Sequence, residues 1–203
     1  MRVLECEQGS EEWFAARLGI PTASSFKDII TSQGKKASAF DRYANTLAAE
    51  ILMGKTPEAF ESEWMRRGTE LEPQARAFYE FERDCDVPQV GFCLLDDGSA
   101  GASPDGLLTD RGLEIKCPAP HTHVAYLAKG KCPAEYVPQV QGCMWICERD
   151  QWDFLSFHPD MPPLLITVNR DEKFIAELSC LVVQLTDRVA ETVSQIQQTQ
   201  EAA

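Results

Sequence analysis

Two acidic residues and a lysine lie close together near the middle of the sequence, in the segment 103–118. Asp105 stands in a Ser-Pro-Asp-Gly sequence typical of a turn, and two short apolar runs joined by a polar, glycine-containing turn follow it. This pattern predicts a β-hairpin. Because side chains alternate across a strand, we expect Glu114 and Lys116 on one face of the second strand, with Asp105 brought toward them from the first.

Two carboxylates beside an ammonium group form a site for a hard divalent cation, with a basic group next to it. Metal-assisted cleavage of a phosphodiester needs this combination. The spacing alone leaves a second interpretation open, because a Glu-x-Lys pair on a strand often belongs to a solvated surface. Phosphodiester cleavage is thus one of two interpretations of these residues.

The elements that must position these residues indicate an α/β protein, with a mixed central β-sheet flanked by helices. Apolar spacing predicts helices at about 10–18, 26–30, 37–53, 62–83, 121–130, 134–147 and 171–198. Besides the hairpin, strands are predicted at about 87–96, 151–158 and 164–169. Pro73, inside the fourth helix, must remove one hydrogen bond. We expect one domain.

Composition and charge restrict the classes of function. With 203 residues and no apolar stretch approaching ~18 residues, the chain is long enough for a core and predicts no membrane span. The N-terminus lacks a secretory apolar segment, so we expect a cytoplasmic location. A net charge of −13 argues against a general nucleic-acid-binding surface, although a local basic groove remains compatible with it.

The cysteines and histidines give no metal-binding pattern. The eight cysteines are scattered without a Cys-x-x-Cys pair, which indicates buried thiols in a reducing compartment. His121 and His123 are expected in a surface turn.

Two further polar positions have alternative interpretations. Hydroxyls at Ser24 and Ser25 precede a predicted helix and could meet a phosphate, or could simply cap that helix. Glu72 could point into a site or lie on the solvated face of its helix.

The Ser-Pro-Asp-Gly and Leu-Glu-Ile-Lys-Cys-Pro sequences together resemble the PD-(D/E)xK nuclease superfamily. More narrowly, the chain resembles the phage lambda-type alkaline exonucleases, or viral recombinases. Blocks in the same order carry this likeness along nearly the whole chain, at 13–19, 22–24, 68–72, 103–106, 113–118 and 139–145. The resemblance implies a single exonuclease domain over 1–203, with a restriction-endonuclease-like core at about 60–170 and a C-terminal helix at about 171–198.

The resemblance implies a metal site. Asp105, Glu114 and the backbone carbonyl of Ile115 would hold a divalent cation, expected to be Mg²⁺ with Mn²⁺ able to substitute. Glu72 corresponds to an additional acidic residue that would support this site or a second ion.

The resemblance also implies roles around the reacting water. Lys116 would orient the attacking water and help to deprotonate it, which requires that the site lower the lysine's pKa. Gln139 would steady the lysine or the water by hydrogen bonding.

Contacts to DNA are implied for a further group of residues. Arg17 and Ser24 would grip the 5′-terminal phosphate, because a guanidinium binds phosphate bidentately. Lys35 and Lys36 lie in a loop that contacts DNA in relatives, although this loop is about two residues shorter here and lacks an arginine. Trp13 would stack at the duplex end, or would be a core residue.

The implied function is 5′→3′ exonuclease activity on linear double-stranded DNA with 5′-phosphorylated ends. It would release mononucleotides and leave a 3′ single-stranded overhang for homologous recombination by strand annealing. The resemblance further implies a homotrimeric ring, a single-strand annealing protein as partner, and a phage or prophage origin, with action in the bacterial cytoplasm.

Two alternatives remain. A RecB-like nuclease of the same superfamily would carry an iron–sulfur cluster, which the scattered cysteines disfavour. A catalytically silent DNA-end or protein-binding module would have no need of the acid, acid and lysine set.

Overall fold

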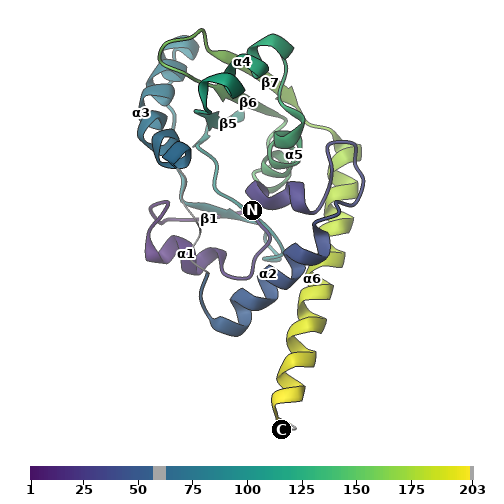
Figure 1. Ribbon diagram of the computed structural model, residues 1–203. Helices are drawn as coiled ribbons and strands as arrows, with labels where there is room; N and C mark the ends of the chain where they lie inside the picture. The colour runs from purple at the N-terminus through teal and green to yellow at the C-terminus, as the bar shows by residue number, and fades with distance from the viewer. Residues whose placement is uncertain (57–62, 202–203) are drawn as a thin grey trace.

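The strands form two sheets in the computed structural model, which describes residues 1–56 and 63–201 (Figure 1). The larger sheet has the order β4 (Gly106–Leu107), β5 (Arg111–Lys116), β6 (Gln151–Ser156) and β7 (Leu164–Asn169). Its β5–β6 pair is parallel and its other pairs are antiparallel. The mixed α/β class and the hairpin formed by β4 and β5 are therefore confirmed.

A second, three-stranded antiparallel sheet was not predicted. It contains β1 (Arg2–Leu4), β2 (Phe92–Leu94) and β3 (Gly101–Ala102) in that order. The strand predicted at 87–96 is shortened to the three residues of β2, and its partners are too short to show a two-residue period.

Helices surround the sheets, and most agree with the predicted ranges. The α-helices are α1 (Glu11–Arg17), α2 (Phe40–Met53), α3 (Glu63–Arg83), α4 (Pro120–Lys129), α5 (Val137–Ile146) and α6 (Glu172–Glu201). Two short 3₁₀ helices, η1 (Ala23–Asp28) and η2 (Ala134–Tyr136), replace the helix predicted at 26–30 and the first turn of the one predicted at 134–147. The reason in the second case is Pro138, which falls in the first turn of α5, where no N–H is needed. Residues 57–62 lie outside the described part, and with them the predicted first residue of the fourth helix.

The larger sheet is covered on both faces. Leu113, Ile115 and Leu155 form one core cluster with residues of α3, whereas Phe154 on the other face belongs to a larger cluster with residues of α5 and α6. In Figure 1, α3 and α5 accordingly lie on opposite sides of β5 and β6, and α6 runs past α2 to the C-terminus. No helix in the described ranges combines the length and apolar character that crossing a membrane requires.

Helix α5 approaches η1 closely because of one glycine. A Cβ atom at Gly142 would lie 2.2 Å from a ring carbon of Phe26, the central buried side chain of η1. This contact holds the helix that carries Gln139 against the turn that carries Ser24.

Two expectations about cysteine and histidine are wrong. All eight cysteines are free thiols, but Cys180 is exposed and three others are only half-buried. His123 lies buried in α4, where its Nε2 donates to the carbonyl of Pro162 (3.0 Å) and its Nδ1 contacts the Ser156 hydroxyl (2.8 Å). The histidine therefore links α4 to β6 and is not in a surface turn.

Candidate functional site

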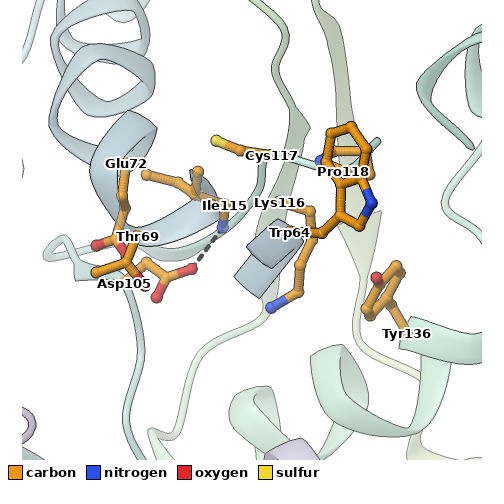
Figure 2. Close-up of a pocket in the computed structure, with 10 residues that line it drawn as sticks. Trp64, Thr69, Glu72, Asp105, Ile115, Lys116, Cys117, Pro118 and Tyr136 are labelled. Atoms are coloured by element: carbon orange, nitrogen blue, oxygen red, sulfur yellow. Dashed lines mark hydrogen bonds between the residues drawn. The ribbon is translucent and has the colours of Figure 1, made fainter. Parts of the chain in front are cut away.

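The β4–β5 hairpin brings Asp105 against the strand that carries Glu114 and Lys116. Gly106 pairs with Leu113, and Oδ2 of Asp105 accepts a hydrogen bond of 2.6 Å from the backbone N–H of Ile115 (Figure 2). Glu114 and Lys116 share the face away from α3 and form an ion pair.

Glu114 is held from two sides and keeps one oxygen unpaired. Its side chain is 2% exposed, and Oε1 accepts hydrogen bonds from Lys116 Nζ and from Nε2 of Gln139 on α5 (2.6 Å for the latter). Within the described ranges, Oε2 is buried and has no hydrogen-bond partner. A buried polar atom without a partner costs free energy, so this oxygen has a strong preference for an additional cation or donor.

Burial disfavours the charged forms of these two neighbouring carboxylates. It raises the pKa of Glu114 to about 7, with the negative charge of Asp105 adding to the effect and Lys116 opposing it. Burial also raises the pKa of Asp105, against the influence of Lys116 and the Ile115 N–H. A cation placed between the two carboxylates would relieve both effects.

Lys116 has a raised pKa, and not the lowered one that proton uptake would require. Burial alone would lower the pKa of this ammonium group, but the charges of Glu114 and Asp105 outweigh it. In this arrangement Lys116 is a fixed positive charge.

Arg76 is a site residue that sequence analysis missed. Its side chain is almost entirely buried and donates both to the backbone carbonyl of Asp105 and, at 2.7 Å, to Oε1 of Glu72, one turn earlier on α3. Burial and the charge of Asp105 raise the pKa of Glu72, while Arg76 opposes this. The i,i+4 spacing of Glu72 and Arg76 was a visible signal, but only the fold shows that Asp105 lies beside them.

Two cavities meet at Asp105 and Lys116, which line both. The first, called here the Trp64 cavity, has a volume of about 380 Å³. Its lining residues are Trp64, Gly68, Thr69, Glu72, Asp105, Ile115, Lys116, Cys117, Pro118 and Tyr136 (Figure 2). The second, called here the Arg17 cavity, has a volume of about 200 Å³ and includes Trp13, Arg17, Ser24, Ser103, Glu114 and Gln139.

The Arg17 cavity contains a partly buried guanidinium group. The Arg17 guanidinium stacks 3.9 Å from the centre of the Trp13 ring, and both side chains donate to the Ser103 hydroxyl, at 3.0 and 2.8 Å. Burial lowers the pKa of Arg17, and no carboxylate in the described part of the chain forms an ion pair with it. A desolvated guanidinium without a carboxylate partner is suited to bind an anion.

Of the other residues expected to contact DNA, one lines the Arg17 cavity and two lie away from both cavities. Ser24 is exposed and lines the Arg17 cavity, and its hydroxyl lies 3.3 Å from that of Thr22 instead of capping η1. Lys35 and Lys36 line neither cavity, and the ammonium group of Lys36 lies 3.7 Å from the centre of the Phe40 ring.

The donor set at β5 fits a hard divalent cation. Asp105 and Glu114 supply carboxylate oxygens, one of them buried without a partner, and Ile115 lines the adjoining cavity. In residues 1–56 and 63–201, no three His, Cys, Asp or Glu side chains are grouped closely enough to hold a metal by themselves. Backbone or solvent oxygens would therefore have to complete the coordination of a cation held by Asp105 and Glu114.

Comparisons with known sequences and solved structures point to the same family. Residues 12–150 match the model of the YqaJ-like viral recombinase domain. The crystal structure of an alkaline exonuclease, LHK-Exo, from Laribacter hongkongensis superposes with a TM-score of 0.87 and 34% identity, covering 95% of this chain and 99% of that one. The same exonuclease in complex with dAMP gives a TM-score of 0.86 and 35% identity, with 96% and 100% covered.

More distant relatives extend the comparison. A phage-related exonuclease from Haemophilus somnus shares the fold, with a TM-score of 0.69 and 19% identity over 87% of this chain and 96% of that one. An uncharacterized protein of Acanthamoeba polyphaga mimivirus is 26% identical over 92% of this chain but only 37% of its own length. The chain thus spans little more than a third of that viral relative.

Proposed function

Because the chain belongs to the YqaJ-like viral recombinase family, we propose that it is a metal-dependent exonuclease acting on linear double-stranded DNA. It degrades one strand in the 5′→3′ direction, releases mononucleotides and leaves a 3′ single-stranded overhang for recombination by strand annealing. The observation that carries this proposal is the convergence of Asp105, Glu114 and Lys116 where the two cavities meet. The solved complex of LHK-Exo with dAMP, a deoxynucleoside monophosphate, supports a mononucleotide product.

Asp105, Glu114 and the Ile115 carbonyl hold the cation in this proposal, with Glu72 supporting the site. Mg²⁺, for which Mn²⁺ can substitute, supplies charge neutralisation at the scissile phosphate when bound. The unpaired Oε2 of Glu114 is the ligand atom that the protein leaves available for it. Arg76 keeps Glu72 and the Asp105 turn together by its two hydrogen bonds.

Lys116 and Gln139 act on either side of Glu114. The Lys116 ammonium orients the attacking water and stabilises negative charge as the phosphate is attacked. Because the charges of the two carboxylates raise the pKa of Lys116, neutralising them would lower that pKa, and more of the lysine would then be in the neutral form that can take a proton from the water. Gln139 is a positioning residue. Its amide donates to Oε1 of Glu114, the oxygen that Lys116 also contacts, and this fixes the direction in which Oε2 points.

The Arg17 cavity binds the 5′-terminal phosphate in this proposal. Arg17 provides the charge, Ser24 a hydroxyl donor, and Trp13 the stacked surface that holds the guanidinium in place. Lys35 and Lys36 contact the DNA backbone farther from the reacting phosphate. These contacts are to phosphates, so we expect little base specificity.

The assembly is proposed from family membership alone. The enzyme forms a homotrimeric ring around the duplex, works with a single-strand annealing protein, and acts in the cytoplasm of a host bacterium. The single domain of 1–203 is proposed on the same basis.

A linear duplex with one 5′-phosphorylated end and a label on that strand tests the function. We expect Mg²⁺-dependent loss of the phosphorylated strand as mononucleotides, abolished by EDTA and by Asp105→Ala. An intact duplex after incubation of the folded protein with Mg²⁺ or Mn²⁺ would refute the proposed activity. Light scattering tests the ring separately, and a monomer mass under the assay conditions would contradict it.

A further inference from the structure

The Trp64 cavity has an aromatic wall that the proposed chemistry leaves without a role. Figure 2 shows Asp105, Thr69 and Glu72 on one side of Lys116, and the rings of Trp64 and Tyr136 on the other. Trp64 is 50% exposed, so its ring is accessible to a ligand that enters the cavity. The ammonium group of Lys116 lies 5.4 Å from the centre of the Tyr136 ring.

The two rings differ in how firmly they are held. Tyr136 packs against Phe154 of β6 at a ring distance of 5.2 Å and against Tyr126 of α4 at 6.3 Å, so it is a fixed surface. Trp64 lies at the beginning of α3, and its ring is 5.7 Å from the Arg67 guanidinium. One half-exposed ring therefore shares a cavity with one fixed ring.

We propose that Trp64 and Tyr136 form a stacking subsite for the base on the 3′ side of the scissile phosphate. This inference rests on the proposed function, which puts the terminal 5′-phosphate in the Arg17 cavity and the scissile phosphate at Asp105 and Lys116. The next nucleotide must then lie on the far side of these two residues, and the Trp64 cavity is the space there.

Stacking fits the chemistry of this wall. Every base has a π-face, so aromatic side chains bind bases without regard to sequence, and one stacked base contributes on the order of five- to one-hundred-fold in affinity. An exonuclease that advances along any sequence needs contacts of this tolerant kind.

The experiment measures release of the first nucleotide in a single turnover from a 5′-phosphorylated linear duplex. A second duplex carries an abasic site at the second position of the cleaved strand, and a third carries it at the tenth position as a control for duplex weakening. The variants are Trp64→Ala, Trp64→Phe and, as a matched control on the same helix, Phe81→Ala. Phe81 is 85% exposed and lines neither cavity.

We expect the second-position abasic site to slow the wild-type enzyme about tenfold, and Trp64→Ala to slow cleavage of intact DNA by a similar factor. Because both changes remove the same contact, Trp64→Ala should cleave the abasic and intact duplexes equally fast. Trp64→Phe should retain most of the wild-type difference in rate between the intact and abasic duplexes, and Phe81→Ala should retain all of it.

The subsite would be overturned if the abasic site slowed Trp64→Ala as much as it slows the wild type, because the two effects would then be additive. Equal wild-type rates on the intact and second-position abasic duplexes would overturn it too, while leaving the nuclease activity established. A wild-type protein that cleaves no linear duplex would instead refute the proposed function, and the subsite with it.

Discussion

The backbone N–H of Ile115 donates a 2.6 Å hydrogen bond to the carboxylate of Asp105. Ile115 is the residue between Glu114 and Lys116, so this single contact ties the turn that presents one acid to the strand that presents the other acid and the lysine. Asp105 also lines both cavities, and its backbone carbonyl accepts a hydrogen bond from Arg76.

Replacing Asp105 with Asn should separate folding from cation binding. The Asn amide oxygen can still accept from Ile115, so the variant should fold, but it loses the negative charge that a cation needs. We expect nuclease activity to fall about a hundredfold or more. Mg²⁺ or Mn²⁺ at about a hundred times its Kd should stabilise the wild type by about 2.7 kcal/mol and the variant by much less, measured by thermal unfolding.

The control for this comparison is Asp160→Asn, because Asp160 is 85% exposed. It should respond to the cation like the wild type. Equal stabilisation of the Asp105→Asn protein would show that the cation binds elsewhere.

Arg76→Met should destabilise the protein by about 2 kcal/mol, because it leaves the Glu72 carboxylate and the partly buried carbonyl of Asp105 without their donor. Chemical denaturation measures this directly. Arg66→Met on the same helix is the matched control, since the Arg66–Glu70 pair is 3.9 Å apart and about two-thirds exposed. Its effect should stay within about 0.5 kcal/mol, and equal losses for both variants would contradict a special role for Arg76.

Arg17→Lys should weaken the preference for 5′-phosphorylated ends about tenfold while retaining the charge. The reason is geometric, because an ammonium group cannot bind a phosphate with the two parallel hydrogen bonds of a guanidinium. Initial rates on duplexes with 5′-phosphate and 5′-hydroxyl ends provide the measurement. If the substitution slows both substrates by the same factor, Arg17 does not recognise the terminal phosphate.

Two helical glycines should respond to alanine in opposite directions. Gly142→Ala places a Cβ atom 2.2 Å from the Phe26 ring, and overpacking of about 1–3 kcal/mol should outweigh the roughly 1 kcal/mol gained in helix propensity. At Gly68, the nearest atom to an added Cβ among the described residues is a carbonyl oxygen at 3.8 Å, so for Gly68→Ala the propensity gain should prevail. Denaturant midpoints of the two variants test this, and a stabilised Gly142→Ala would mean that α5 and η1 are not tightly packed.

Local patterns in the sequence predicted the elements that hold the reacting groups. The alternation of Leu113, Glu114, Ile115 and Lys116 is a property of a strand, and the structure places these side chains on alternating faces as expected. The strand at 164–169 was likewise recognisable, because its residues form a nearly unbroken apolar run between two prolines and an arginine.

Features that depend on distant residues could not be predicted in this way. Arg76 matters because α3 crosses beside the Asp105 turn, 29 residues later in the chain. The raised pKa of Lys116 depends on the charges of two carboxylates that the fold holds beside it, which no spacing reveals. The burial of His123 depends on two distant partners, the Ser156 hydroxyl on β6 and the Pro162 carbonyl in the loop after it, which hydrogen-bond to its ring.

The shared wall between the Arg17 and Trp64 cavities bears on the size of the product. If the end of the strand is anchored on one side of Asp105 and Lys116, and the bond to be broken lies beside them, the interval between anchor and cut fixes how much of the strand is released, which in the proposed function is one nucleotide. The length of the released fragment would then be set by the fixed separation of two protein side chains, and it would stay at one nucleotide whatever the base composition of the DNA.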